Sequence, residues 1–193
     1  MSTSTITYLE QTSPNGVRPA KEPRQPVDVR LVEEVSPEFA RFLYASVGGD
    51  WYWTEKLSWT WDRWIAWLTR PAFETWVAYA GGVPAGYIAL KAEGTEVEVE
   101  NFGLLPGFIG RGIGGHLLTV GLRSAWSFPQ RHPEIDQVTR VWLHTNTLDG
   151  PNALGNYEAR GLRRYKTEKE ERPEADGPPP GPWPGAAKPP AAS

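Results

Sequence analysis

Short stretches in which apolar residues alternate with polar ones, or follow one another directly, divide the chain into predicted strands. Two of them, Glu74–Ala80 and Pro84–Ala92, are joined by Gly81-Gly82, which is typical of a hairpin turn. A third, Glu96–Leu105, alternates acidic and apolar residues before it becomes apolar, which indicates a strand with one partly solvated face. Further strands are expected at Val27–Val32, Gln137–Thr145 and Arg163–Lys166.

Capping residues and helical spacing predict the helices. Ser36 followed by Pro37 is typical of an N-cap and the first helical position, and the helix is expected to run to about Val47. Thr60 caps a second helix, on one face of which lie Trp61, Trp64, Ile65 and Leu68. Two more are expected at Gly112–Ser127 and Asn152–Arg160. The order β-α-α-β-β-β-α-β-α-β mixes hairpins with parallel crossovers and therefore predicts an α+β fold with a mixed sheet.

Both ends of the chain differ from its middle in composition. Residues 1–26 are rich in Ser, Thr and Pro, and residues 167–193 pass from a charge cluster into a Pro/Gly/Ala-rich segment. Neither end contains enough apolar surface to offset the entropy of ordering it, so both are predicted to be disordered tails. A single folded domain is expected over residues 27–166.

Overall composition excludes several classes of protein. The 193 residues include no cysteine, and the three histidines, His116, His132 and His144, have no ligand-like spacing, so neither a disulfide nor a metal site is expected. A net charge of −3 argues against nucleic acid or anionic lipid as a partner. Without a signal peptide or a long apolar run, the chain is expected to be cytoplasmic, as a monomer or homodimer.

A glycine-rich segment between a predicted strand and a predicted helix is the strongest chemical signal. The strand ends at Leu104-Leu105-Pro106, and Gly110, Gly112 and Gly114 follow before the helix. This arrangement directs unpaired backbone N–H groups and a helix N-terminus toward one point, which suits a pyrophosphate. Glycines allow the backbone to approach the anion closely, and Arg111 could add a charge-assisted contact.

Two other phosphate loops fit less well. A Walker loop ends in Gly-Lys-Ser/Thr, which is not found here. A dinucleotide fingerprint is met only loosely by Gly110–Gly115, and its later acidic residue would fall near Glu134, in a loop instead of at a strand end.

The segment resembles the hallmark of the GNAT superfamily of N-acetyltransferases, Gln/Arg-x-x-Gly-x-Gly/Ala after a strand ending in hydrophobic-x-Pro. The Gln/Arg position is Ile109 here. In the family this residue mainly supplies a backbone amide, which isoleucine also has. A second block resembles the family's Asn-x-x-Ala…Tyr-x-x-x-Gly-Phe segment, running from Asn152 through Tyr157 to Gly161-Leu162. The resemblance covers residues 29 to 165 and implies a mostly antiparallel mixed sheet with a splayed central strand pair.

The resemblance further implies a donor, an acid and a base for acetyl transfer to a primary amine without a metal. The acetyl-CoA donor would be held by Leu104, Leu105, Ile109, Gly110, Arg111, Gly112, Ile113, Gly114 and Gly115, with Asn152 at its pantetheine arm. Tyr157 takes the place of the general acid, and a backbone N–H at or next to Leu104 that of the oxyanion donor.

Two acidic residues compete for the role of base. Even-numbered side chains of the Glu96–Leu105 strand should share one face, so that Glu98 and Glu100 would lie beside Phe102 and Leu104. Glu98 is the first choice and Glu100 the second, while a water relay is a third route in the family. Alternating charge is also typical of a strand face that is simply solvated.

Tryptophan is concentrated where an acceptor pocket is expected. Six tryptophans fall between Trp51 and Trp67, and Trp51, Tyr52 and Trp53 are the best candidates for binding a small, apolar or aromatic amine. Trp61 and Trp64 fit core packing better. Asp50, Glu55 or Asp62 could hold an ammonium group, and the sequence does not choose among them. The alternative function is a non-catalytic module that binds acyl-CoA.

Overall fold

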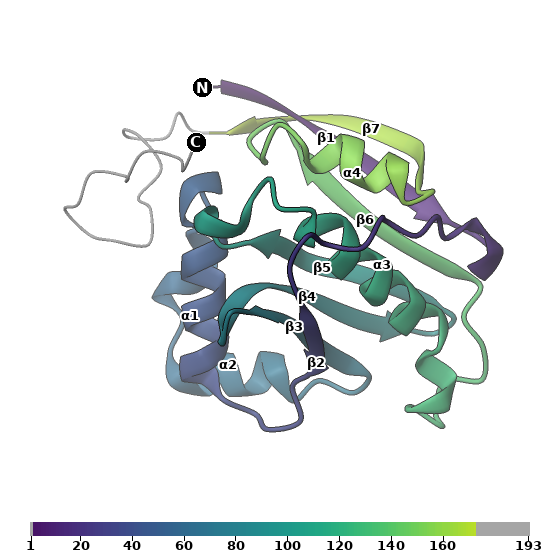
Figure 1. The fold of residues 1–193 in the computed structure, drawn as a ribbon, viewed down its shortest axis with the longest axis horizontal. Coiled ribbons are helices and arrows are strands. Elements are labelled where there is room, and N and C mark those ends of the chain that lie inside the picture. The colour runs from purple at the N-terminus through teal and green to yellow at the C-terminus, as the bar shows by residue number, and fades with distance from the viewer. Residues whose placement is uncertain (1, 173–193) are drawn as a thin grey trace.

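The computed structural model describes residues 2–172, which form one seven-stranded sheet with helices on both faces (Figure 1). The strands are β1 (Ser2–Gln11), β2 (Asp28–Leu31), β3 (Phe73–Ala80), β4 (Val83–Glu93), β5 (Glu96–Leu104), β6 (Arg140–Asn146) and β7 (Arg163–Arg172). The helices are α1 (Pro37–Gly48), α2 (Trp61–Leu68), α3 (Ile113–Trp126) and α4 (Ala153–Ala159). Strand order is β2-β3-β4-β5-β6-β1-β7, and the β5–β6 pair is parallel whereas the others are antiparallel. The predicted α+β fold with a mixed, mostly antiparallel sheet is confirmed.

The capping signals in the sequence set the starts of the first two helices. Ser36 Oγ accepts a hydrogen bond from the Phe39 N–H at 3.2 Å, and Thr60 Oγ1 accepts one from the Arg63 N–H at 3.3 Å. Such bonds satisfy N–H groups that have no partner inside the helix. The β3–β4 hairpin turns at Gly81 and Gly82, whose φ angles of 61° and 83° favour glycine.

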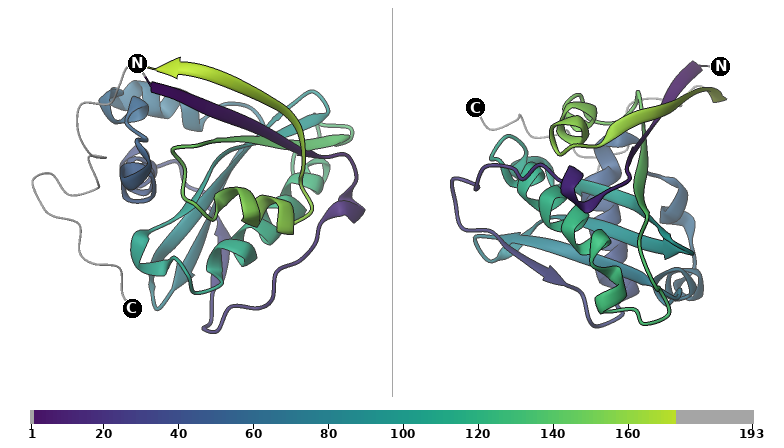
Figure 2. Two further views of the ribbon diagram at one scale, coloured as in Figure 1. Left: turned by 90° about the horizontal axis from the view of Figure 1, so that it is seen from above. Right: turned by 90° about the vertical axis from the view of Figure 1, so that its right-hand side faces the viewer.

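Helices cover the sheet in two layers. Figure 2 shows α1 and α2 on one face and α3 and α4 on the other. The neighbouring strands β3 and β4 are apolar on both faces: Val77, Tyr87 and Ala89 pack in a cluster with α1, and Ala78, Ile88 and Leu90 in a cluster with α3. Burial on both sides accounts for the uninterrupted apolar run in β4.

The first of the two predicted disordered tails is ordered in the structure. Residues 2–11 form β1, which lies between β6 and β7 and pairs with both (Figure 1). Residues 17–26 then run along α3, where the Ala20 N–H donates to Thr119 Oγ1 at 3.0 Å. Composition alone does not reveal this strand, because its pairing partners come from the other end of the chain.

The second predicted tail begins later than expected. The last strand, β7, continues to Arg172, since residues 167–172 pair with β1. Eight of the ten residues of this edge strand are charged, which is a common way to keep a sheet edge from pairing with another chain. The rest of the predicted tail, residues 173–193, lies outside the described residues.

Because β1 completes the sheet, it should contribute to stability. Leu9 is fully buried in the cluster on the α3 face. Leu9→Ala is expected to lower the free energy of unfolding by about 2–5 kcal/mol, whereas the exposed-site variant Thr3→Ala should change it by less than about 0.5 kcal/mol. Denaturant unfolding of both variants measures this difference, and equal midpoints would show that β1 does not belong to the folded core.

At the centre of the sheet the two parallel strands separate. Register between β5 and β6 runs from Glu96 opposite Arg140 only to Glu98 opposite Trp142, although both strands continue further. The predicted splayed strand pair is therefore present. Within residues 2–172, no helix combines the length and apolarity that crossing a membrane requires, and no cluster of His, Asp and Glu could hold a metal.

Candidate functional site

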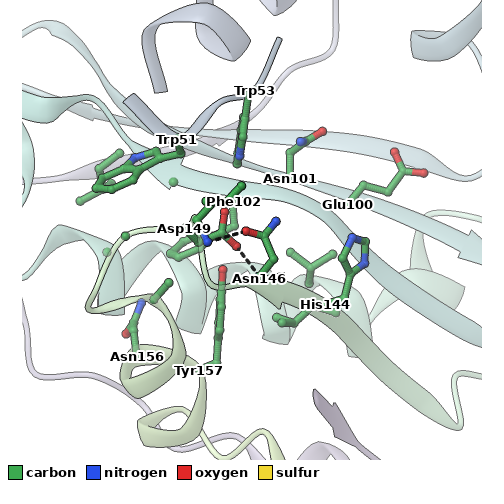
Figure 3. A pocket seen from close by; sticks show the side chains of 18 of the residues that line it. Trp51, Trp53, Glu100, Asn101, Phe102, His144, Asn146, Asp149, Asn156 and Tyr157 are labelled. Atoms are coloured by element: carbon green, nitrogen blue, oxygen red, sulfur yellow. Dashed lines mark hydrogen bonds between the residues drawn. The ribbon is translucent and has the colours of Figure 1, made fainter. Parts of the chain in front are cut away.

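A cavity of about 1150 Å³ opens where β5 and β6 separate. It is lined by β5, the end of β6, the loop after β6, the start of α3 and the segment after α1, and Figure 3 shows these side chains converging. Thirteen of the sixteen residues predicted for the site line it: Trp51, Tyr52, Trp53, Glu98, Glu100, Leu104, Ile109, Gly110, Gly112, Gly114, Gly115, Asn152 and Tyr157.

Three residues predicted to bind the donor do not line the cavity. Leu105 packs into the apolar cluster beside α1, and Ile113, the first residue of α3, is fully buried in the core. Arg111 is exposed, and its guanidinium lies over the Phe108 ring, 5.1 Å from the ring centroid, and not in the cavity. Sequence spacing located the segment correctly but could not separate the residues that face the cavity from those that face the core.

The glycine-rich turn has the backbone geometry of an anion site. Gly110 and Gly112 have φ angles of 85° and 81°, and the first bond of α3 runs from the His116 N–H to the Gly112 carbonyl. No side chain caps α3. The N–H groups from Gly110 to Gly115 thus have no backbone partner among the described residues, and they lie at the positive end of the helix dipole.

Two neighbours modify this turn. The Ile109 N–H already donates to the Pro106 carbonyl at 3.3 Å, so the free amides begin at Gly110 and not at Ile109. Arg160, which the sequence did not single out, brings Nη1 beside Gly115, within 2.5 Å of where a Cβ would lie. Its guanidinium adds positive charge to the start of α3.

Tyr157 lies below the point at which the strands part. The residue is buried, its ring contacts Phe102 edge-on at 5.8 Å, and its hydroxyl points into the cavity (Figure 3). Burial, followed by the negative charge of Asp149, raises the pKa of Tyr157. The phenol therefore keeps its proton throughout the neutral range and can donate it.

A backbone N–H of β5 also faces the gap. The Leu105 N–H donates to the Ala85 carbonyl of the neighbouring β4 at 2.9 Å. Since successive amides of a strand point to opposite sides, the Leu104 N–H points away from β4 toward the side where β6 has separated. This is the orientation expected of the predicted oxyanion donor.

The expected sharing of one face by Glu98, Glu100, Phe102 and Leu104 is wrong. Ala89 of β4 pairs with Asn101, and the next residue, Leu90, pairs with Val99. Glu100 has no partner between them and is the extra residue of a β-bulge. The bulge reverses the alternation, and Phe102 and Leu104 pack on the α3 face together with Val97 and Val99. The bulge is not visible in the acidic and apolar pattern, because both sides of it still alternate.

Glu98 has the properties of a base at neutral pH. Its side chain is largely buried, at 25% exposure, and Oε1 lies 3.7 Å from His144 Nδ1. Burial, reinforced by the charge of Glu100, raises the pKa of Glu98 to about 7. Near neutral pH a carboxyl group with this pKa is partly ionised, and its ionised form is basic enough to accept a proton.

Glu100 is committed to a different interaction. Its two oxygens accept hydrogen bonds from both terminal nitrogens of Arg70, at 2.7 and 2.6 Å. A bidentate pair of this kind holds the carboxylate in one orientation and occupies both of its oxygens. The geometry therefore favours Glu98 over Glu100 as the base.

Asn152 and the loop before it close the other side of the cavity. Asn152 precedes α4 but makes no side-chain capping bond, so its side chain is not used to start the helix. Asp149 fixes the loop by accepting hydrogen bonds from Thr145 Oγ1 at 2.5 Å and from the Asn146 N–H at 3.0 Å. The same carboxylate lies near enough to Tyr157 to affect its titration.

Aromatic residues form the wall on the side of α1 and α2. Trp53 contacts Tyr44 at 5.5 Å, and a Cβ at Gly150 would lie 3.3 Å from the Trp51 ring, so Trp51 closes against the loop after β6. Trp64 is buried as expected, but Trp61 is exposed and its Nε1 donates to Glu38, so its assignment to the core is wrong.

Sequence reasoning did not select four residues that line the cavity. Trp59 and Trp67 line it together with Lys56, which lies between them. Asn101 lines it too and is buried, with no hydrogen-bond partner for Oδ1 among residues 2–172. A buried polar atom without a partner is unusual and calls for an explanation. A lysine within an aromatic-rich loop and an asparagine next to the acidic stretch were the only signals.

Comparison with known proteins relates this geometry to a family. The model of the acetyltransferase (GNAT) family matches residues 33–162. None of the curated proteins that were compared matches the chain.

Solved structures share the fold at low identity. A GCN5-related N-acetyltransferase from Sphaerobacter thermophilus has a TM-score of 0.60 at 18% identity, over 91% of this chain and 54% of that chain. One from Kribbella flavida has a TM-score of 0.56 at 20% identity, over 86% and 56%. A putative acetyltransferase of the GNAT family from Novosphingobium aromaticivorans has 0.56 at 14% identity, over 88% and 63%. The chain thus spans little more than half the length of these structures.

Proposed function

The chain belongs to the acetyltransferase (GNAT) family, and from this premise we propose that it transfers the acetyl group of acetyl-CoA directly to the primary amine of a small molecule. One observation carries the proposal. The free N–H groups at the start of α3, the hydroxyl of Tyr157 and the carboxylate of Glu98 all line the same cavity, where β5 and β6 separate. Amide donors, an acid and a base are the groups that transfer from a thioester to an amine requires.

The donor fits the part of the cavity next to α3. The unpaired amides from Gly110 to Gly115 suit a diphosphate, and Arg160 adds a positive charge beside Gly115. Asn152, free of a capping role, is available to an amide of the pantetheine arm. The thioester would then lie between the diverging strands, next to the Leu104 N–H.

Each reacting group has a residue to act on it. Glu98 takes a proton from the acceptor ammonium, so that the amine can attack the acetyl carbonyl. The Leu104 N–H donates a hydrogen bond to the carbonyl oxygen as negative charge develops there. Tyr157 donates its proton to the departing sulfur, and the proton that the attached nitrogen loses as the amide forms restores the phenol. The aromatic wall formed by Trp51 and Trp53 excludes water and contacts the apolar part of the acceptor.

A thiol-release assay tests the proposal. Purified protein with acetyl-CoA and a panel of primary amines is expected to release CoA only when an amine is present, with an acetylated amine detected by mass spectrometry. Tight binding of acetyl-CoA without any amine-dependent release would instead support a non-catalytic acyl-CoA-binding module.

The pH profile tests the base. Because Glu98 must be ionised and its pKa is about 7, kcat/KM is expected to rise through about pH 7. Glu98→Gln should abolish this limb and lower kcat/KM by about 10²- to 10⁴-fold. The limb from the acceptor's own amine lies near pH 10 for an alkylamine and should be the same in all variants.

A second variant separates the two candidate bases. The charge of Glu100 raises the pKa of Glu98, and the charge of Arg70 lowers it. Glu100→Gln removes the charge that raises the pKa and leaves Arg70 without its partner carboxylate. This variant should therefore keep the limb but move it to lower pH. If Glu100→Gln abolishes the limb and Glu98→Gln merely shifts it, Glu100 is the base and the assignment of Glu98 is wrong.

A further inference from the structure

Lys56 occupies an aromatic enclosure on the wall of the cavity. Its Nζ lies 5.2 Å from the centroid of Tyr44 and 5.4 Å from the centroids of both Trp59 and Trp67. All three distances are within the range of a cation–π contact. The side chain is half-buried, and burial lowers its pKa.

This ammonium forms no ion pair among the described residues. No carboxylate of residues 2–172 lies within ion-pair distance of Nζ, and the charges of Glu55, Glu100 and Glu98 act on it only from longer range. Glu100, a carboxylate of the same cavity, is bound on both oxygens by Arg70. Ring faces attract a cation, but they do not accept the three N–H donors of an ammonium as a carboxylate does. A half-buried cation without such a partner is costly, unless a ligand supplies the partner.

A second polar group on the same wall also lacks a partner. Asn101 is only 8% exposed, lines the cavity and has an Oδ1 atom with no hydrogen bond. Figure 3 places it on the same side of β5 as Glu100. The amide oxygen accepts hydrogen bonds, so an N–H group suits it, and the nearby carboxylate of Glu98 suits the same group. The cavity thus offers acceptors for an amine and, at Lys56, donors for an anion.

We infer that the acceptor is a primary amine that also carries a carboxylate, which pairs with the Lys56 ammonium while the amine lies between Glu98 and Asn101. This inference rests on the proposed function and names its substrate class. A carboxylate fits better than a phosphate, because Lys56 is the sole Lys or Arg among the described residues that line the cavity. Phosphates are usually held by several donors or a bidentate arginine, and Arg70 is already paired.

Matched substrates test the inference. Aromatic amino acids and their carboxamides differ in charge but hardly in shape. Their amines also differ in pKa, but that difference is the same for every variant, so the change in the ratio of their kcat/KM values between variants isolates the anion. The ratio of carboxylate to carboxamide is expected to be about 30-fold higher in wild-type protein than in Lys56→Met, which corresponds to about 2 kcal/mol for a charged hydrogen bond. Lys56→Met keeps the unbranched stem among the rings and removes the charge. Lys56→Arg should retain most of the wild-type ratio.

The exposed residue Lys21 provides the matched control, since Lys21→Met removes the same charge away from the cavity and should keep the wild-type ratio. If Lys56→Met keeps the wild-type ratio of carboxylate to carboxamide, the inference is wrong while the proposed function stands. Preference for an aminoalkyl phosphate over the carboxylate overturns the choice of anion. Binding of acetyl-CoA without turnover of any amine overturns both proposals.

Discussion

Tyr157→Phe is expected to lower kcat by about 10²- to 10⁴-fold, the usual contribution of a general acid, while leaving the affinity for acetyl-CoA within about twofold. The variant loses only the hydroxyl, because a phenylalanine ring can keep the edge-on contact with Phe102. The Tyr157 hydroxyl forms no hydrogen bond with residues 2–172, so its removal should hardly change the free energy of unfolding. Steady-state kinetics with a saturating amine, together with titration of acetyl-CoA, measures both quantities.

A second buried tyrosine serves as the control for this result. Tyr87 lies in the sheet on the α1 face and does not line the cavity, so Tyr87→Phe removes a buried hydroxyl without touching the site. Its kcat should stay at the wild-type value. If Tyr157→Phe also turns over at the wild-type rate, the leaving thiolate is protonated by another group and Tyr157 is not the acid.

Gly112→Asp is expected to weaken acetyl-CoA binding by about 100-fold relative to Gly112→Asn. Both side chains tolerate the positive φ of 81° better than other residues and have nearly the same shape. They differ in charge, and a carboxylate at the start of α3 would lie where the diphosphate is proposed to bind. Repulsion between like charges at close range costs several kcal/mol, and 1.4 kcal/mol is about tenfold in affinity. Isothermal titration of the two variants gives the ratio.

The same pair of substitutions at Gly107 controls for charge in the turn as a whole. Gly107 is exposed, does not line the cavity, and has open space where a Cβ would project. Gly107→Asp and Gly107→Asn should therefore bind acetyl-CoA equally well. Equal affinity of Gly112→Asp and Gly112→Asn, in folded proteins, would mean that the turn does not hold the diphosphate.

Local chemistry explains which parts of the fold the sequence predicted. The caps at Ser36 and Thr60 and the glycine turn at residues 81–82 act within a few residues of themselves, so reading them required no tertiary information. The glycine-rich turn before α3 was found for the same reason. These signals located most strands, all four helices and the loop that begins at Gly110.

Features that depend on distant contacts were not predicted. The strand β1 is stable because it fills the space between β6 and β7, and its Ser- and Thr-rich sequence does not name those partners. The bulge at Glu100 depends on how β5 pairs with β4 and left no trace in the alternation. Lys56 became a candidate only once Tyr44, Trp59 and Trp67 were seen to surround it.

The candidate catalytic residues were predicted from the sequence only in part. The resemblance identified Tyr157 by its place in the second family block, which runs from Asn152 to Leu162. The choice between Glu98 and Glu100 needed the structure, because the two carboxylates differ only in what surrounds them. Arg70, thirty residues earlier in the chain, binds Glu100 and leaves Glu98 as the carboxylate with the raised pKa.

A crystal structure with bound CoA tests the central claim most directly. The account predicts diphosphate oxygens about 3 Å from the amide nitrogens between Gly110 and Gly115, and the sulfur between β5 and β6 within reach of the Tyr157 hydroxyl. A complex in which CoA binds elsewhere, with the start of α3 unliganded, would contradict it.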